Sequence, residues 1–408
     1  MALILELARW LLLVAEICIA APVFYLCIIS LSAILTSRKR RIENARSASL
    51  LSAQHFSFAI LIPAHNEEVI INKLLESLSG LHYPKELYTV HVVADNCTDR
   101  TAELIQKTGW AHVHERSDQK KRGKGYALNW LIEKLTGEQL IYDAYIILDA
   151  DSVVEPGFLQ AMARELAKGA QALQANNTVL NISEAPSAAL RLVAMALVNH
   201  VRPLGRNGIG STSTLTGNGM CLSDALLQRH PWQAFSIGED YQYYLMLVEH
   251  GERVHYVPEA VVRSQMPITF AQMRTQDLRW ESAEERTTRS IALRLLRVGL
   301  KERDFVRLEA VAELLTPPLS FTVGTVGLTV LFSLLLSALP QLIVSILLCA
   351  GLCGYIGTAF YLLRPPREVY MALLHAPRFA VWKLWVYFVL RRKKSYRTEW
   401  VRTSRTVS

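Results

Sequence analysis

The stretch "AYIILDADSVVEP" (144–156) decides the fold, because a short apolar run ends in two aspartates one residue apart. Tyr145 to Leu148 is apolar and short, which predicts a buried strand. In an extended backbone, residues i and i+2 point to the same side, so we expect Asp149 and Asp151 to face one point. Such carboxylates repel each other unless a cation lies between them. A hard divalent ion bound to phosphates would meet that need; solvated loop acids or helix caps are the alternative.

Apolar and helical segments alternate around this stretch. The predicted strands cover residues 58–62, 88–94, 111–114 and 145–148, and the predicted helices begin at about 67 and cover 101–107 and 126–135. This alternation predicts parallel βαβ units in an open α/β sheet. Ligands of such sheets bind beyond the carboxyl ends of the strands. Three of those ends carry acids, in "PAHNEE" (63–68), "DNCTD" (95–99) and "DADS" (149–152), so we expect them to line one crevice.

Two uncharged apolar runs predict membrane helices in this chain of 408 residues with a formal net charge of +8. The run from Ile17 to Ser37 is long enough for one span, which needs about 20 residues. It is too long for a cleaved signal peptide and lacks a small-residue cleavage site, so we expect residues 1–37 to form a retained anchor. The run over 319–363 is long enough for two helices with a turn near Ala338 to Gln341. About three spans are therefore predicted.

Basic residues flank these runs on one side. Arg38 to Arg41 follow the first run, and Arg364, Arg367 and "RRKK" (391–394) follow the second. Because basic flanks remain on the cytoplasmic side, the central domain is predicted to be cytoplasmic and the protein a multi-pass protein of the cell membrane (inner or plasma membrane).

Two further segments predict helices that lie on the membrane surface. Residues 289–308 place Ile291, Leu295 and Val298 on one side of a helix whose other side is basic, which is typical of an interfacial helix. A surface helix packed on the globular core is the alternative. Residues 370–408 predict an interfacial helix followed by a basic cytoplasmic tail.

Seven motifs together suggest a family. In chain order they are "IPAHNEE" (62–68), "VVADNCTDRTAE" (92–103), "KRGKGYALN" (121–129), "LDADS" (148–152), "TGNGM" (216–220), "GEDYQYYL" (238–245) and "QDLRW" (276–280). This series resembles the membrane-bound family 2 glycosyltransferases, in particular the branch of cellulose, hyaluronan and poly-N-acetylglucosamine synthases. The resemblance covers roughly residues 60–280. It implies a nucleotide-sugar-binding domain of the GT-A type over 55–265, a UDP-sugar donor, Mg²⁺ or Mn²⁺, and inversion at the anomeric carbon.

The resemblance also implies which residues bind the donor. The residues that match nucleotide-contacting positions are Pro63, Asn66, Glu67 and Asp95. Asn66 is also a candidate helix cap. Arg122 and Lys124 lie in a glycine-flanked turn where cations can approach a diphosphate, with a solvated basic loop as the alternative. Asp149 and Asp151 match the DxD motif, whose metal bridges the two phosphates and neutralises charge on departing UDP.

The remaining matches concern the transfer step. Asp240 matches the family's base, which takes the proton from the acceptor hydroxyl. The neighbouring Glu239 would steady the loop or cap the following helix, and capping is also the alternative for Asp240. Within 266–317, the resemblance assigns the QxxRW motif to three residues: Gln276, Arg279 and Trp280. The arginine would pair with the diphosphate and the tryptophan would stack on an acceptor sugar.

The leading functional hypothesis is sugar transfer from a UDP-sugar to a membrane-associated acceptor in polysaccharide or extracellular glycan synthesis. Transfer of a single sugar to a lipid or lipid-linked acceptor is the alternative, because three membrane-spanning helices are few to enclose a channel for a polysaccharide. A partner protein or a second copy of the chain could complete such a channel. A binding protein that had lost transfer should lack a key acid, yet Asp149, Asp151 and Asp240 are all present. No nucleic-acid partner is expected, because the basic residues cluster at membrane borders.

Overall fold

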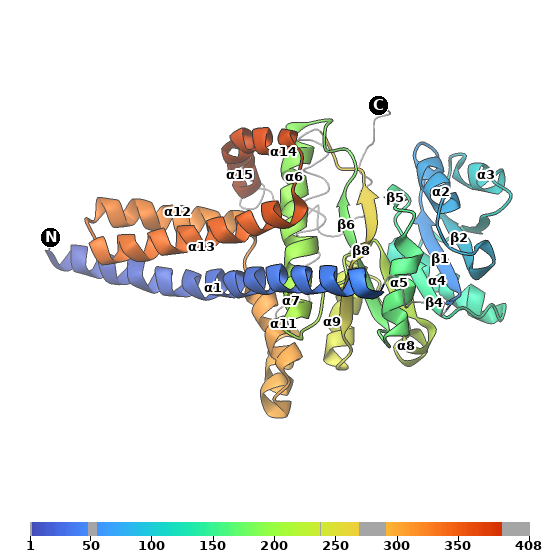
Figure 1. The fold of residues 1–408 in the computed structure, drawn as a ribbon, viewed down its shortest axis with the longest axis horizontal. Helices are drawn as coiled ribbons and strands as arrows, with labels where there is room; N and C mark the ends of the chain where they lie inside the picture. Colours follow the sequence, from blue (N-terminus) through green and yellow to red (C-terminus); the bar gives the residue numbers. More distant parts are fainter. Residues whose placement is uncertain (1, 48–54, 237, 269–290, 386–408) are drawn as a thin grey trace.

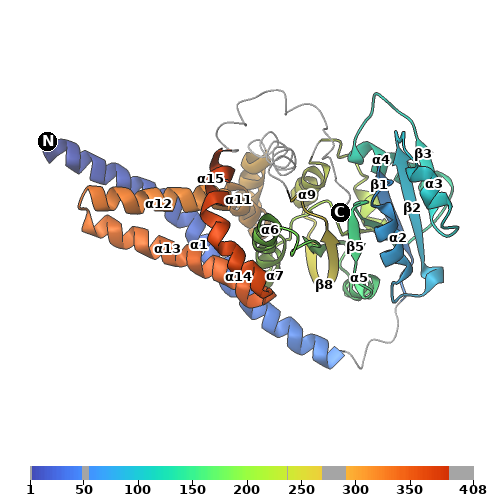
Figure 2. The ribbon, with the colours of Figure 1, turned by 90° about the horizontal axis from the view of Figure 1, so that it is seen from above.

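The computed structural model describes residues 2–47, 55–236, 238–268 and 291–385. A bundle of long apolar helices extends from one side of an α/β domain, and further helices lie across the junction between the two parts (Figure 1). The view from above shows the same arrangement (Figure 2).

The α/β domain contains one eight-stranded sheet with the strand order β3-β2-β1-β4-β7-β6-β8-β5. Its strands are β1 (Phe58–Ala64), β2 (Tyr88–Asp95), β3 (His112–Arg116), β4 (Ala144–Ile147), β5 (Ser152–Val154), β6 (Ala172–Val179), β7 (Met220–Ser223) and β8 (Val254–Ser264). β1 to β4 are parallel, which confirms the predicted half of the sheet. β7 runs antiparallel to β4 and β6, β8 is parallel to β6, and β5 is antiparallel to β8.

Helices cover both faces of the sheet. One core contains α2 (Ile71–Ser79) and α5 (Phe158–Ala167), and the other contains α4 (Lys124–Gly137), α8 (Asp224–Arg229) and α9 (Glu239–Glu249). Alternate residues of β1 enter the two cores: Ile60 faces the first, and Leu61 faces the second. The sheet is thus buried on both sides, and its strand ends are left for ligands. The remaining helix of this half is α3 (Thr101–Gln106).

Three helices form the apolar bundle: α1 (Ala2–Ser47), α12 (Leu319–Leu335) and α13 (Leu339–Leu363). By length and composition, α1 and α13 could cross a membrane among the described residues. A third helix could also cross if α12 and the preceding α11 (Phe305–Leu315), which meet at 65°, count as one span. α1 continues ten residues beyond the expected end of the anchor at residue 37.

The predicted continuous helix over 289–308 is wrong at one point. A helix covers 291–302, Arg303 adopts a φ of 54°, and Asp304 then caps α11 by accepting hydrogen bonds from two backbone amides. Ile291 and Leu295 are buried against the α/β domain, as the alternative predicted. Leucines on the other side stay exposed, such as Leu293 and Leu300.

Shorter helices occupy the junction between the bundle and the α/β domain (Figure 1). They are α6 (Pro186–Ala196), the π-helical turn η2 (Leu197–Val201), α7 (Arg202–Gly208), α14 (Arg367–Ala372) and α15 (Ala376–Trp385). α14 packs on α6, and α1 packs on α7. The part of the predicted interfacial helix beyond residue 385 lies outside the described residues.

A buried ion cluster joins the two parts. Arg206 of α7 donates to both carboxylate oxygens of Glu309 on α11, at 2.8 and 3.0 Å. Arg202 donates to Glu313 at 3.1 Å. Tyrosines from α1, α9 and α13 complete the cluster: Tyr25, Tyr244 and Tyr355. Because Arg206 is only 1% exposed, its charge depends on these partners.

We predict that Glu309→Ala destabilises the protein by about 3–5 kcal/mol, because Arg206 would remain charged and buried without its carboxylate. Thermal unfolding of the detergent-purified chain measures the effect. The control is Glu103→Ala, which breaks an exposed i,i+4 pair with Lys107 and should cost no more than about 1 kcal/mol. Equal losses in the two variants would contradict the role given to the buried cluster.

Candidate functional site

The loops after β1 and β2 are tied together at the carboxyl edge of the sheet. The His65 ring is 2.7 Å from the Asp95 carbonyl oxygen, and the Glu67 amide donates to the Thr101 hydroxyl at 2.8 Å. Asn66 has a φ of 56°, and its side chain accepts from the Thr98 amide at 2.7 Å. The expected cap is therefore wrong, because α2 begins at Ile71 and Asn66 instead fixes the neighbouring loop.

Asp95 ends β2 and is buried with an arginine that the sequence analysis missed. Arg116, the last residue of β3, donates to Asp95 Oδ1 at 2.5 Å, and Asn96 donates to the same oxygen at 3.0 Å. Burial raises the pKa of the Asp95 carboxyl, and Arg116 opposes this rise. The predicted strand ended at residue 114, two residues short of this arginine. Pro63 lies on the neighbouring β1, in register with Val93.

Asp149 and Asp151 lie in a turn between β4 and β5 and not in an extended strand. The Ser152 amide donates to the Asp149 carbonyl oxygen at 3.2 Å and closes the turn. The side chain of Asn218 also holds this turn in place. The Asn218 side chain accepts from the Asp149 amide at 3.1 Å and donates to the Ser152 hydroxyl at 2.8 Å. The expectation that both carboxylates project from one strand face is therefore wrong, although the two acids remain at the predicted sheet edge.

Lys124 lies among the acids of two segments and the backbone of a third. Its ammonium donates to Asp149 at 2.6 Å and to the Gly217 carbonyl oxygen at 2.6 Å, and Glu239 lies 3.7 Å away. Burial alone would lower the pKa of Lys124, but Asp149 and Glu239 raise it, so the amine stays charged. This ammonium is the positive charge that lets these carboxylates converge. Arg122, by contrast, is exposed on the loop before α4.

Asp240 joins this cluster at the start of α9. A Cβ atom at Gly217, where φ is +78°, would lie 2.8 Å from Asp240 Oδ2 and 3.3 Å from Lys124 Nζ. The "TGNGM" segment (216–220) therefore passes directly against the Asp240 carboxylate and the Lys124 amine. The other Asp240 oxygen accepts from the Tyr241 amide at 2.8 Å, at the helix N-terminus. α9 begins at Glu239 after Gly238, and no side chain among the described residues caps it, so Asp240 lies in the first turn of the helix without capping it.

Glu239 and Asp240 have raised pKa values. Burial is the main cause that raises the pKa of Glu239 to about 7; Lys124 lowers it in part, and the Asp240 carboxylate adds to the rise. Burial also raises the pKa of Asp240, against the charge of Lys124. Carboxyl groups with raised pKa values are candidates for acid-base work.

The loop that leads into α9 packs on the start of α4. Gly125 permits this contact, because a Cβ there would lie 2.1 Å from the Ala234 carbonyl oxygen. The rings of Tyr126 and Phe235 stack with their centroids 4.6 Å apart, and Phe235 remains 39% exposed. This contact connects the element that carries Lys124 to the one that carries Asp240.

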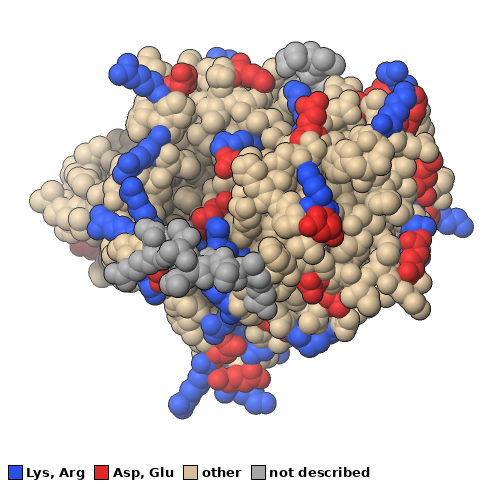
Figure 3. Space-filling model, turned by 45° about the vertical axis from the view of Figure 1, so that its right-hand side comes forward, with Lys and Arg blue, Asp and Glu red and all other residues tan. Residues whose placement is uncertain are grey.

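Three predicted site residues cannot be placed. Gln276, Arg279 and Trp280 lie outside the described residues. Of the predicted site residues that the structure describes, Lys124, Asp149 and Asp240 lie together. Glu239, which was expected only to steady the loop or cap the helix, lies beside them. Figure 3 views the α/β side of the molecule, where basic and acidic side chains are interspersed over the surface.

Comparison with known proteins identifies the family. A family model described as "Glycosyltransferase like family 2" matches residues 55–283, more than half of the chain. The chain belongs to this glycosyltransferase family. It is 24% identical over 230 residues to a probable glycosyltransferase, YdaM, of Bacillus subtilis, a match that covers 54% of each chain. It is 37% identical over 105 residues to a beta-monoglucosyldiacylglycerol synthase of Nostoc, covering 25% of this chain and 21% of that one.

The fold of this family 2 glycosyltransferase also resembles a solved structure. The mannosyltransferase PcManGT from Pyrobaculum calidifontis, in complex with GDP-Man and Mn²⁺, superposes with a TM-score of 0.50. The match covers 94% of this chain and 99% of that chain at 15% sequence identity. At this identity the match concerns the fold alone, which is α/β of the GT-A type with appended apolar helices.

We predict that Gly217→Ala lowers kcat about a hundredfold, because the new methyl group would displace Asp240 and force an unfavourable φ. The control is Gly137→Ala at the end of α4, where a Cβ meets no atom within 4 Å. Sugar transfer by both purified variants, at matched protein concentration, measures the effect. A Gly217→Ala variant with the turnover of the control would show that this segment is not close to the reacting groups.

The raised pKa of Glu239 predicts a pH-dependent stability. Between its ordinary value and about 7, the folded protein retains a proton that the unfolded chain releases, so rising pH destabilises the wild type. Glu239→Gln cannot titrate, and its melting temperature relative to wild type should increase from about pH 5 to about pH 8. Glu103→Gln is the control, because Lys107 lowers the pKa of Glu103 and its titration lies below this window. A constant difference for Glu239→Gln would refute the raised pKa.

Proposed function

We propose that the protein is an inverting, metal-dependent glycosyltransferase that transfers a sugar from a UDP-sugar to a membrane-associated acceptor. The observation that carries this proposal is the convergence at the carboxyl edge of the sheet of Lys124, which donates to Asp149 and to Gly217, and Asp240, which lies against Gly217. The family match supports the reaction type. The chain spans only 54% of the length of YdaM and 21% of that of the Nostoc enzyme, so substrate and acceptor are part of the proposal.

The donor is proposed to lie across the ends of β1, β2 and β4. Asp95 would accept hydrogen bonds from uracil or ribose, because Arg116 and Asn96 both use one of its oxygens, Oδ1. Pro63, Asn66 and Glu67 would flank the nucleotide. Lys124 would exchange Asp149 for a diphosphate oxygen, and the exposed Arg122 would approach the same phosphates.

The acids at this edge suit Mg²⁺ or Mn²⁺, which prefer carboxylate oxygens. Asp149 and Asp151 would hold the ion. The described residues contain no group of three or more potential ligands, so diphosphate oxygens and water would supply the rest. Bound there, the ion would neutralise charge on the departing UDP.

Asp240 is the proposed base. An inverting transfer needs a carboxylate on the side of the sugar opposite UDP, within hydrogen-bond reach of the acceptor hydroxyl. Asp240 lies beside Gly217, whose carbonyl oxygen contacts Lys124, and burial raises the pKa of the Asp240 carboxyl, which favours proton acceptance. Glu239 points its carboxylate toward Lys124 and would hold that amine in place. Gln276, Arg279 and Trp280 are proposed to close the site beside the diphosphate and the acceptor.

A lipid or lipid-linked acceptor is the acceptor we favour. The name of the Nostoc relative describes a glucosyl lipid synthase, and the described part of the chain has only two or three helices able to span a membrane. Polysaccharide synthesis is the second candidate, because the sequence carries QxxRW. In either case we propose a multi-pass protein of the cell membrane with the α/β domain in the cytoplasm, as the basic flanks of α1 and α13 indicate.

The decisive assay incubates the detergent-purified chain with radiolabelled UDP-sugars and GDP-Man, with Mg²⁺ or Mn²⁺, and separates lipid-extractable from polymeric product. We expect lipid-extractable product from a UDP-sugar. Asp240→Asn should retain UDP binding and abolish this product, because the amide cannot accept the proton. Asp143→Asn, at the other end of β4, is the control and should keep activity. Near-normal turnover by Asp240→Asn would overturn the assignment of the base.

A further inference from the structure

The ends of α1 and α13 nearest the α/β domain bring arginines together. The apolar run of α1 ends at Arg38, and α13 ends before Arg364. Arg38 donates to the hydroxyl of Tyr361 on α13 at 3.1 Å, so the two ends lie side by side. The charges of Arg41 and Arg364 also act on this hydroxyl. Arg41 follows Arg38 by three residues on α1, and Arg364 follows Tyr361 by three residues at the end of α13, so three arginines lie at these adjoining helix ends.

This arginine cluster lies at the depth of lipid head groups if α1 spans the membrane. At the far end of α1, Arg9 donates to the carbonyl oxygen of Leu336 in the turn between α12 and α13. Arg9 and Arg38 are separated by a helical rise of about 43 Å. A bilayer with its head-group layers is about 40–45 Å thick. The two ends of the bundle thus match the two surfaces of a membrane.

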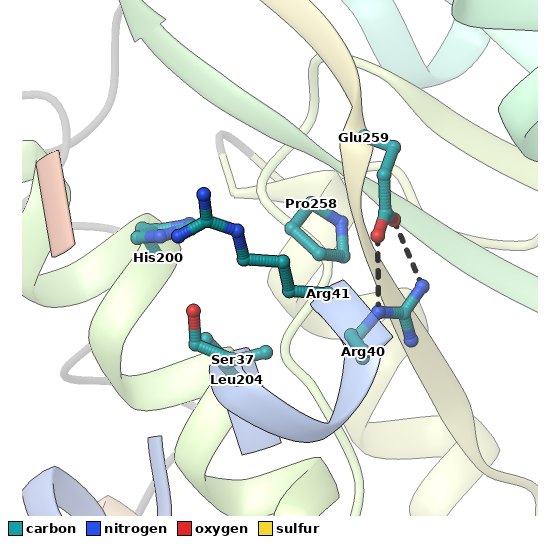
Figure 4. A pocket seen from close by; sticks show the side chains of 7 residues that line it. All are labelled: Ser37, Arg40, Arg41, His200, Leu204, Pro258 and Glu259. Atoms are coloured by element: carbon teal, nitrogen blue, oxygen red, sulfur yellow. Dashed lines mark hydrogen bonds and ion pairs between the residues drawn. The ribbon is translucent and has the colours of Figure 1, made fainter. Parts of the chain in front are cut away.

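A pocket of about 270 Å³ opens beside the arginine cluster, between α1, η2, α7 and the irregular part of β8. Its lining includes Ser37 and Arg41 of α1 and His200 of η2. Figure 4 shows the Arg41 side chain reaching across to His200, with the Ser37 hydroxyl below it. The pocket therefore presents a guanidinium and a hydroxyl, both of which donate hydrogen bonds.

The acids near the pocket are already paired with a different arginine. Arg40 donates to Glu165 at 2.8 Å and to Glu259 at 2.9 Å, as the dashed lines in Figure 4 mark for Glu259. The salt bridges of the described residues include none to Arg38, Arg41 or Arg364, and all three are exposed. The His200 ring is 2.7 Å from the Tyr256 hydroxyl, and burial lowers the pKa of His200 to about 4, so the ring is neutral at pH 7.

We propose that Arg38, Arg41 and Arg364, with the Ser37 hydroxyl, bind the phosphate of an anionic phospholipid head group. One guanidinium group can donate two parallel hydrogen bonds to phosphate oxygens. Basic pockets between membrane helices are typical sites for acidic head groups. Such a lipid would hold α1 and α13 against η2, which leads into the α7 arginines of the buried ion cluster. This site goes beyond the proposed reaction; it needs the helices to be in a membrane but does not need sugar transfer.

The test is native mass spectrometry of the full chain titrated with phosphatidylglycerol or phosphatidylcholine. We expect the wild type to retain phosphatidylglycerol preferentially, and Arg41→Gln and Arg38→Gln each to reduce that retention several-fold. Lys39→Gln is the matched control. Lys39 is on the same helix, is exposed and pairs with Glu43, so its loss should leave retention unchanged.

Three results would overturn the proposal. The first is equal retention of both lipids by the wild type, and the second is an equal loss in the arginine and Lys39 variants. The third comes from calorimetry with soluble glycerol phosphate: binding as tight as that of the lipid would assign the site to a free phosphate compound. Because neither measurement uses a sugar donor, the lipid site can fail without the proposed transfer reaction failing, and the reverse also holds.

Discussion

The candidate site depends on one electrostatic constraint: the carboxylates of two segments, the turn after β4 and the start of α9, can converge only around a cation. In the structure the ammonium of Lys124 fills that role, in contact with Asp149 and close to Glu239 and Asp240. Much of the surrounding backbone serves this arrangement. Gly125 lets the loop before α9 approach α4, and Gly217 lets the chain pass against Asp240. On donor binding, the diphosphate would take the place of Asp149 beside Lys124, and the metal ion would take the place of Lys124 beside Asp149. The acids would not need to separate.

A second set of buried charges connects this site to the bundle of apolar helices. Tyr244, which accepts a hydrogen bond from Arg206, lies one helical turn after Asp240 on α9. The Arg206 partner Glu309 also accepts from Tyr25 of α1. The helix that carries the proposed base is therefore held by a continuous series of buried hydrogen bonds that begins on the longest apolar helix. This arrangement fixes the orientation of the site relative to the bundle from which a membrane-bound acceptor would approach.

Local sequence pattern was sufficient to predict the parallel half of the sheet. β1, β2 and β4 lie within two residues of their predicted ends, because each is a short apolar run followed by polar residues. The antiparallel β7 was not predicted, since its place between β4 and β6 depends on pairing between segments far apart in the chain. The break at Arg303 was missed because the apolar spacing continues through it, whereas the Asp304 cap that starts α11 is a local backbone event.

For the candidate site, the sequence indicated which acids lie at this edge of the sheet, but not how their side chains are held. Asp149 and Asp240 lie at the expected edge, but the turn around Asp149 depends on Asn218, which is distant in sequence and whose role no local pattern indicates. Arg116 was missed for a similar reason, because its partner Asp95 lies on another strand. Asn66 was assigned a cap because asparagine often precedes a helix, while in the fold its side chain satisfies a neighbouring loop.

The most direct measurement is anomalous diffraction at the manganese edge from crystals grown with UDP and Mn²⁺. The account predicts a manganese peak at the carboxylates of Asp149 and Asp151, with the diphosphate beside Lys124 and the Asp240 carboxylate left open to an acceptor. A peak at another edge of the sheet, or UDP bound while Lys124 still pairs with Asp149 and no ion is present, would contradict it.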